Sequence, residues 1–246
     1  MYSLNEYGHM LADKVRTRAY VQALQRAVQP GAVVVEIGTG VGYFALVAAR
    51  LGASRVYAFE PSVHVGIAER LIEANGGAPI QLIRARSIQV ALTEQADVVF
   101  SDLRGSVPVF ADHFASVVDA RTRLLRPGGI LIPQRDELWA ALVESEPLYR
   151  RTVGVWRSVE TDLNMGPAVE AQVCSPMKTR LSEGELLSDA QFWSALDYQT
   201  LEMRSFEKAI TLTALRQGVS HGLGVWFDAT LLADIRYSNH PSQPPL

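Results

Sequence analysis

The stretch Ala32-Val-Val-Val-Glu-Ile-Gly-Thr-Gly-Val-Gly42 decides the fold of this 246-residue chain. Its first six residues are a short and mostly apolar run, which is typical of a strand buried on both faces of a sheet. Three alternating glycines follow and lead into a helix-like segment. Glycine permits positive φ angles and leaves room for a ligand beside the backbone. The stretch therefore predicts a strand, a tight ligand-binding turn and a helix.

Strand-like and helix-like segments continue to alternate on both sides of this turn. Short apolar runs predict further strands at 55–60, 80–84, 97–100 and 129–132. Apolar spacings of three and four residues predict helices at 1–29, 43–51 and 62–75. This alternation predicts an α/β fold with a doubly wound parallel sheet.

The pattern changes around residue 134. The segments 137–143, 208–215 and 224–228 look like strands that are separated by turn residues, without long helices between them. We therefore expect residues 1–133 to form one domain with a helical lid at its N-terminal end. Residues 134–246 are expected to form an antiparallel, β-barrel-like domain.

Composition narrows the class of protein. The chain is 48% hydrophobic and 20% charged, with a net charge of −3, so no global field attracts nucleic acid or an anionic membrane. The single Cys174 excludes an internal disulfide framework and a multi-cysteine zinc site, and we expect no metal. No apolar run approaches the roughly 20 residues that span a bilayer, and no signal peptide is evident. We expect a cytoplasmic protein.

Glu60 ends the second expected strand, where a carboxylate can accept both hydroxyls of a ribose. A dinucleotide-binding turn needs a glycine at the position of Tyr43, and no phosphate-binding G-x-x-x-x-G-K-S/T motif occurs. The G-x-G-x-G spacing is instead similar to motif I of class I methyltransferases. This similarity implies S-adenosylmethionine as the cofactor and S-adenosylhomocysteine as its product.

Several segments together resemble the protein arginine methyltransferase family: Tyr7-Gly-His-Met-Leu-Ala-Asp-Lys-Val-Arg-Thr-Arg-Ala-Tyr20, Glu36-Ile-Gly-Thr-Gly-Val-Gly42, Val56-Tyr-Ala-Phe-Glu-Pro61, Arg84-Ala-Arg-Ser-Ile88, Leu125-Arg-Pro-Gly-Gly-Ile-Leu-Ile-Pro133 and residues 216–228. The resemblance implies that the N-terminal helix folds over the cofactor. It implies that Met10 packs near the sulfonium and that Arg16 pairs with the cofactor carboxylate, as a guanidinium does bidentately. The other cofactor contacts that it implies are Glu36, Gly38, Thr39, Gly40, Gly42, Glu60, Pro61, Ser87 and Ile88. Residues 155–175 lie where the family inserts a dimerisation arm, which suggests a homodimer.

The segment 101–114 departs from the family's loop of two glutamates, which holds the acceptor guanidinium. Asp102 replaces the first glutamate, Ala111 stands at the second with Asp112 beside it, and Arg104 adds a positive charge. The family's threonine-histidine-tryptophan motif aligns just beyond Leu246. A guanidinium stays protonated and is hard to methylate without such a clamp, whereas an amine, a phenolate or a carboxylate can attack without it.

Two residues are candidates for catalysis. Asp102 can orient a cation or act as a general base, or it can simply cap the loop that follows its strand. His113 matches a family position near the cofactor, although a single histidine can equally be structural. Three functions remain open: a methyltransferase for a nitrogen or oxygen of an unknown acceptor, a true protein arginine methyltransferase, or a catalytically silent cofactor-binding module.

Overall fold

A parallel sheet forms the first half of the protein in the computed structural model, which describes residues 2–77, 79–109, 113–202 and 207–243. Its strand order is β3-β2-β1-β4-β5. The strands are β1 Val33–Ile37, β2 Arg55–Phe59, β3 Ile80–Ile83, β4 Ala96–Ser101 and β5 Leu125–Ile132. Because they are parallel, their carboxyl ends meet at one edge, and the strand order reverses direction there between β1 and β4. In open sheets of this kind a ligand binds at that reversal.

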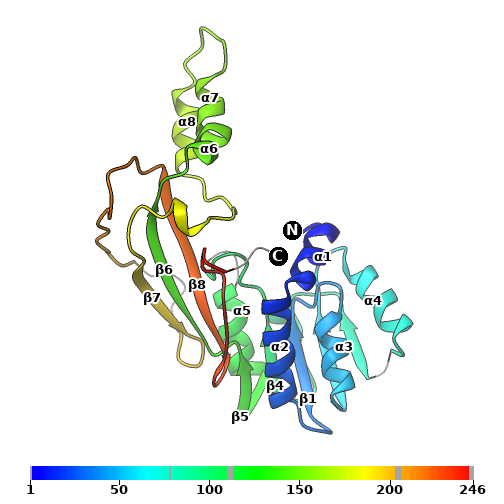
Figure 1. Ribbon diagram of the computed structural model, residues 1–246. Coiled ribbons are helices and arrows are strands. Elements are labelled where there is room, and N and C mark those ends of the chain that lie inside the picture. Colours follow the sequence, from blue (N-terminus) through cyan, green and yellow to red (C-terminus); the bar gives the residue numbers. More distant parts are fainter. Residues whose placement is uncertain (1, 78, 110–112, 203–206, 244–246) are drawn as a thin grey trace.

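Helices cover this sheet (Figure 1), namely α1 Leu4–Ala12, α2 Lys14–Ala27, α3 Tyr43–Arg50, α4 Val65–Ala74 and α5 His113–Asp119. Residues 1–29 are mostly helical, as predicted, but they form two helices, because the helix is interrupted at Asp13 between α1 and α2. Asp13 has an extended backbone there, and its carboxylate accepts the Arg16 N–H at 2.9 Å. This N-cap starts α2 in a new direction.

An antiparallel sheet of order β7-β6-β8-β9 forms the second half. Its strands are β6 Arg135–Val143, β7 Gln191–Asp197, β8 Gly222–Leu232 and β9 Ile235–Ser238. The prediction of a strand at 208–215 is wrong, since only Ala214 forms an isolated bridge there, with Ser188. Most of the segment 207–219 is exposed, so its apolar residues face no buried surface that would fix it as a strand.

Short helices extend from the end of β6 away from both sheets (Figure 1), and we call residues 145–180 the arm. They are α6 Glu146–Tyr149, a π-helical turn at Arg150–Gly154, α7 Val155–Arg157 and α8 Gly166–Val173. In the part of the chain that the structure describes, no helix is both long and apolar enough to cross a membrane.

One continuous apolar core joins the two sheets. Leu24 of α2, Phe100 of β4 and Leu231 of β8 are all buried in the same cluster. The helix α2 lies against α3 on one side and contacts β8 and β9 on the other. The antiparallel sheet is thereby held beside the carboxyl end of β4, where the candidate site lies.

Candidate functional site

The glycine turn is locked to the neighbouring strand. The N–H groups of Gly38 and Thr39 both donate to the Phe59 carbonyl at 2.9 Å. Gly38, Gly40 and Gly42 have φ angles of 76°, 58° and 85°, in the left-handed region that favours glycine. The turn therefore needs glycine at all three positions for backbone reasons alone.

Two side chains approach this turn so closely that a Cβ would collide with them. A Cβ on Gly38 would lie 2.3 Å from Leu103, and one on Gly40 would lie 2.4 Å from the Tyr7 ring. Tyr7 belongs to α1, and its ring also packs edge-on against His64 at 5.0 Å. The N-terminal helix α1 thus packs on the glycine turn through Tyr7.

Glu60 is buried directly after β2, and backbone groups hold both of its carboxylate oxygens. One oxygen accepts the Gly40 N–H at 2.8 Å and the other accepts the Ser62 N–H at 2.9 Å. The carboxylate is therefore fixed in orientation beside the glycine turn. A fixed carboxylate with lone pairs to spare is suited to accept hydrogen bonds from vicinal hydroxyls.

Glu36, the last polar residue of β1, is also buried and accepts the Thr39 hydroxyl at 2.5 Å. Burial raises the pKa of Glu36 to about 8, against the lowering effect of its hydrogen bonds from Thr39 and from the Ala45 backbone. At neutral pH this residue is mostly a neutral acid. It supports the turn without adding a full negative charge.

The remaining predicted cofactor residues lie in different surroundings. Ser87 is buried in a short helical turn after β3, and its hydroxyl has no hydrogen-bond partner among the described residues. Ile88 beside it is 41% exposed, and Pro61 is exposed between Glu60 and α4. The carbonyl of Met10 accepts the Arg16 Nη1 group at 2.7 Å, so the structure brings these two predicted residues together.

Asp102 follows the last residue of β4 and lies at the centre of a charged cluster. Its Oδ2 atom accepts Arg16 Nε at 2.6 Å, and its Oδ1 atom lies 3.0 Å from the Tyr20 hydroxyl. Arg104 Nη2 is 3.6 Å from the same Oδ1 atom. The Asp102 carboxylate thus lies against two arginine side chains, and 16% of the Asp102 side chain remains exposed.

Arg104 is wholly buried, with carboxylate and hydroxyl oxygens around it. Its Nη1 donates to Asp136 at 2.6 Å, and its Nη2 donates to the hydroxyls of Tyr20 and Tyr237 at 2.7 Å each. Burial opposes its charge, but these neighbours hold the pKa of Arg104 well above the usual value. The group is a permanent cation.

His113 joins the same network at the start of α5. Tyr198 donates its only hydroxyl proton to Asp136 at 2.6 Å, so His113 Nε2 must donate to the Tyr198 oxygen at 2.9 Å. Burial and the charge of Arg104 lower the pKa of His113 to about 3. The ring is neutral, and its Nδ1 atom has no partner among the described residues.

Sequence reasoning missed four members of this cluster: Tyr20, Asp136, Tyr198 and Tyr237. Asp136 gave no clear signal in the sequence, because it stands between Arg135 and Glu137 in a run of polar residues just before the strand expected at 137–143. Ala111 and Asp112 lie outside the described residues. No group of three His, Cys, Asp or Glu residues in the described part of the chain could hold a metal ion.

Comparison with known proteins agrees with this architecture. Residues 14–149, more than half of the chain, match the family model described as Ribosomal protein L11 methyltransferase (PrmA). The chain is 26% identical to Probable protein arginine N-methyltransferase 6 of Arabidopsis thaliana over 97% of its length, and 28% identical to Probable protein arginine N-methyltransferase 6.1 of Oryza sativa subsp. japonica over 96%. It spans only 55% and 61% of those relatives.

Solved structures share the whole fold. The Trypanosoma brucei PRMT1 enzyme-prozyme heterotetrameric complex with AdoHcy has a TM-score of 0.86 at 21% identity, over 99% of this chain and 79% of that one. Arabidopsis thaliana Protein Arginine Methyltransferase 10 has a TM-score of 0.81 at 23% identity, over 98% and 79%.

The chain belongs to the protein arginine methyltransferase family. Residues 14–149 also match the methyltransferase model PrmA, so by family the chain is a class I S-adenosylmethionine-dependent methyltransferase.

The residues of this arginine methyltransferase family member fit the cofactor of the family. Glu60 is fixed beside the glycine turn, and the buried hydroxyl of Ser87 has no hydrogen-bond partner among the described residues. These groups lie after β1, β2 and β3, which end at the same edge of the sheet. A nucleoside with ribose hydroxyls and polar base atoms suits this set of donors and acceptors.

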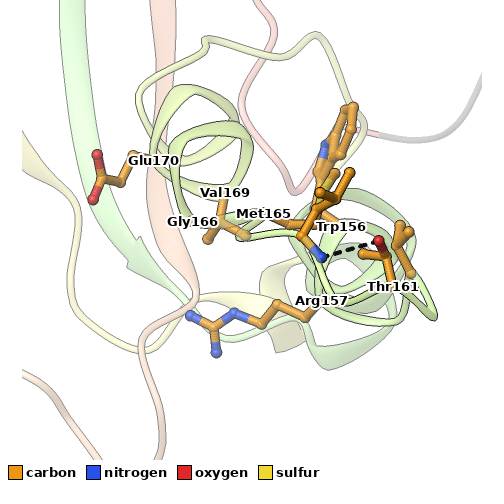
Figure 2. Close-up of a pocket in the computed structure, with 9 residues that line it drawn as sticks. Trp156, Arg157, Thr161, Met165, Gly166, Val169 and Glu170 are labelled. Carbon is orange, nitrogen blue, oxygen red and sulfur yellow. Dashed lines mark hydrogen bonds between the residues drawn. The ribbon is translucent and has the colours of Figure 1, made fainter.

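The arm of this family member carries a cavity of about 580 Å³ between α7, α8 and the loop that joins them. Figure 2 shows Trp156 and Met165 in its wall, with Arg157 and Glu170 extending to the side away from Thr161. The Thr161 hydroxyl accepts the Leu163 N–H at 3.1 Å. Leu163 is 71% exposed and Val173 is 63% exposed, so the arm presents apolar surface to its surroundings.

Proposed function

We propose that this chain binds S-adenosylmethionine at the glycine turn and transfers its methyl group to a nitrogen or oxygen of an acceptor other than arginine. The fixed Glu60 carboxylate beside Gly40 supports the ribose site, and the buried Ser87 hydroxyl supports an adenine site nearby. The other cofactor contacts that we propose are Met10, Arg16, Glu36, Gly38, Thr39, Gly42, Pro61 and Ile88.

Asp102 is the residue that we assign to the acceptor. The cofactor, when bound, would supply a methyl group to the acceptor's nucleophilic atom, with the thioether S-adenosylhomocysteine as the leaving group. Asp102 lies next to Arg16, which we assign to the cofactor carboxylate, so it stands where donor and acceptor groups would meet. Its carboxylate can orient the acceptor and take its proton. His113 already donates to Tyr198, and we assign it to holding Tyr198 and Asp136 in place.

The contact between Asp102 and Arg16 is the observation that carries this proposal. The test combines calorimetry of S-adenosylhomocysteine binding with transfer of radiolabelled methyl to extracts that contain small molecules and proteins. We expect micromolar binding and a labelled acceptor, with labelling lost in Asp102→Ala. Absence of cofactor binding by the folded chain would refute the proposal.

A silent cofactor-binding module is the second candidate, because one observation favours it. Arg16 and Arg104 both lie against Asp102, so the only described carboxylate of segment 101–114 is already neutralised. Normal S-adenosylhomocysteine binding without transfer to any extract would favour this function. A true arginine methyltransferase would need Asp102 together with Asp112, and methylation of an arginine peptide would reveal it.

We further propose that a second copy of the chain docks on the arm. The Trypanosoma brucei relative is described as a heterotetramer, and the arm of this chain exposes apolar side chains far from the sheets. We also propose that the chain consists of two domains, a cofactor-binding domain at residues 1–133 and a second domain at residues 134–246. Cytoplasmic location stays a prediction from composition.

A further inference from the structure

The surroundings of Arg104 have the chemistry of a binding site for a guanidinium group. Asp136 accepts from Nη1 at 2.6 Å, and the hydroxyls of Tyr20 and Tyr237 accept from Nη2 at 2.7 Å. Asp102 adds a second carboxylate at 3.6 Å. Two carboxylates and two hydroxyls therefore surround one planar cation.

Aromatic rings complete this enclosure. The central carbon of Arg104 lies 5.1 Å from the ring centres of both Phe227 and Tyr237 and 5.8 Å from that of Tyr20. Rings at these distances favour a flat, weakly hydrated guanidinium over a compact ammonium. The pocket is thus selective for the shape of an arginine head group and not only for its charge.

The location of this pocket connects it with the proposed reaction. Arg104 follows Asp102 by two residues in the loop after β4, and Leu103 between them covers Gly38 of the cofactor turn. Asp102 is partly exposed, whereas Arg104 has no exposed surface. Seen from solvent, the guanidinium lies behind the carboxylate that we assign to the acceptor.

We propose that Arg104 is a specificity-determining residue, whose guanidinium fills the acceptor pocket and excludes a substrate arginine from it. The inference rests on the proposed function, because it takes Asp102 to face the acceptor. The acceptor of this protein is then a group that reaches Asp102 without entering the pocket, and an uncharged nucleophile meets that condition.

Arg104 also ties the two sheets together, because Asp136 lies on β6 and Tyr237 on β9. If that were its whole role, removing the side chain would leave a sealed void inside the protein. A sealed void can admit a small free ion but not a group that is attached to a peptide. An acceptor pocket would open to solvent past Asp102 and admit both.

The experiment uses the full chain carrying Arg104→Ala. Calorimetry measures its binding of guanidinium at millimolar concentration and of N-acetyl-arginine methylamide, with the citrulline and lysine analogues as uncharged and ammonium controls. We expect the variant to bind the arginine compound at least tenfold more tightly than the wild type does, and at least tenfold more tightly than it binds either analogue. Arg126→Ala is the matched control, since Arg126 also donates to an aspartate at 2.6 Å but at the surface. That variant should not bind the arginine compound.

Two results would overturn the inference. Binding of free guanidinium without the arginine compound would show a sealed structural cavity, and binding of neither would show no pocket. A titration of the wild type with S-adenosylhomocysteine reports separately on the proposed function, so the two failures are distinguishable.

Arg104→Ala leaves Asp136 buried without its partner, which can prevent folding. The double variant Arg104→Ala/Asp136→Asn removes that charge and keeps Asp102 and the aromatic rings. We expect it to prefer the arginine compound over the citrulline compound by at least threefold. Equal binding of the arginine and citrulline compounds by the double variant would also overturn the inference.

Discussion

Arg16 Nε lies 2.6 Å from Asp102 Oδ2, so a residue assigned to the cofactor and a residue assigned to the acceptor form one ion pair. Only 14% and 16% of their side chains are exposed. Burial opposes the charge of Arg16, but Asp102 raises the pKa of the guanidinium above its usual value. If a cofactor carboxylate pairs with Arg16, it therefore has to share the Arg16 guanidinium with Asp102.

Removing the charge of Asp102 should strengthen cofactor binding. In Asp102→Asn, Arg16 is freer to pair with the cofactor carboxylate, and a nearby like charge is gone. We expect S-adenosylhomocysteine to bind roughly 3- to 10-fold more tightly by calorimetry, which corresponds to about 0.6–1.4 kcal/mol. Asp97→Asn is the control, because Asp97 lies near the opposite end of β4 and pairs with Arg126. Weaker binding in Asp102→Asn would contradict the assignment of Arg16.

Replacing Glu60 by Ala should weaken binding of the same compound. The loss is expected to be about 1.5–3 kcal/mol if the carboxylate accepts the ribose hydroxyls, since such hydrogen bonds involve a charged group. Glu69→Ala, at an exposed site on α4, should leave the affinity unchanged. Circular dichroism checks that the sheet is intact in both variants. Unchanged affinity in Glu60→Ala would rule out a ribose site at this carboxylate.

Glu36 should make the protein less stable as pH rises. Its pKa is about 8 in the folded protein because of burial, against an ordinary value of 4.5, so the folded state holds more protons between these values. The contribution of Glu36 to stability is then present below pH 4.5 and is lost progressively up to about pH 8, at no more than about 1.4 kcal/mol per pH unit.

The variant Glu36→Gln isolates this effect, because glutamine keeps an oxygen for the Thr39 hydroxyl but cannot ionise. Urea unfolding at pH 5 and pH 8 should show the wild type losing stability relative to the variant by roughly 2–4 kcal/mol across that range. Glu73→Gln, at an exposed position on α4, should show no such difference. A parallel pH dependence of wild type and Glu36→Gln would exclude a raised pKa.

The arm should control the oligomeric state. Leu163→Ser/Val173→Ser removes two of its most exposed apolar side chains without disturbing the buried core. Sedimentation velocity should show a dimer for the wild type and a shift of at least tenfold in the dissociation constant for the variant. Leu223→Ser, at an exposed apolar site on β8, is the matched control. A wild-type monomer at high micromolar concentration would refute docking of a second copy on the arm.

The donor half of the candidate site could be predicted because its parts are local. The strand, the three glycines and the helix after them are contiguous in sequence, and positive φ angles at Gly38, Gly40 and Gly42 follow from that order. Glu60 directly follows the adjacent strand β2, so its place beside Gly40 follows from the parallel pairing of β1 and β2. The resemblance to the family added Arg16, whose contact with Asp102 is nevertheless a contact across 86 residues.

The acceptor half could not be predicted in this way. Arg104 meets Asp136 and Tyr237, which lie 32 and 133 residues further along the chain. No local sequence pattern indicates these contacts. They form only because α2 holds the antiparallel sheet beside the carboxyl end of β4. The prediction of a strand at 208–215 is wrong for a related reason. An alternating apolar pattern does not form a strand where no neighbouring surface is available to pack against it.

The sequence by itself determined the parallel sheet, the glycine turn and the carboxylate beside it, because backbone sterics and strand periodicity act over a few residues. Only the tertiary structure decided the surroundings of Asp102 and Arg104. These groups are buried between the two sheets and shielded from water. Because an unpaired buried charge is costly, each charged group is paired with an oppositely charged or polar group of a neighbouring element. That requirement links Arg16, Asp102, Arg104 and Asp136 into one network, although they come from three separate segments, namely α2, the loop after β4 and β6.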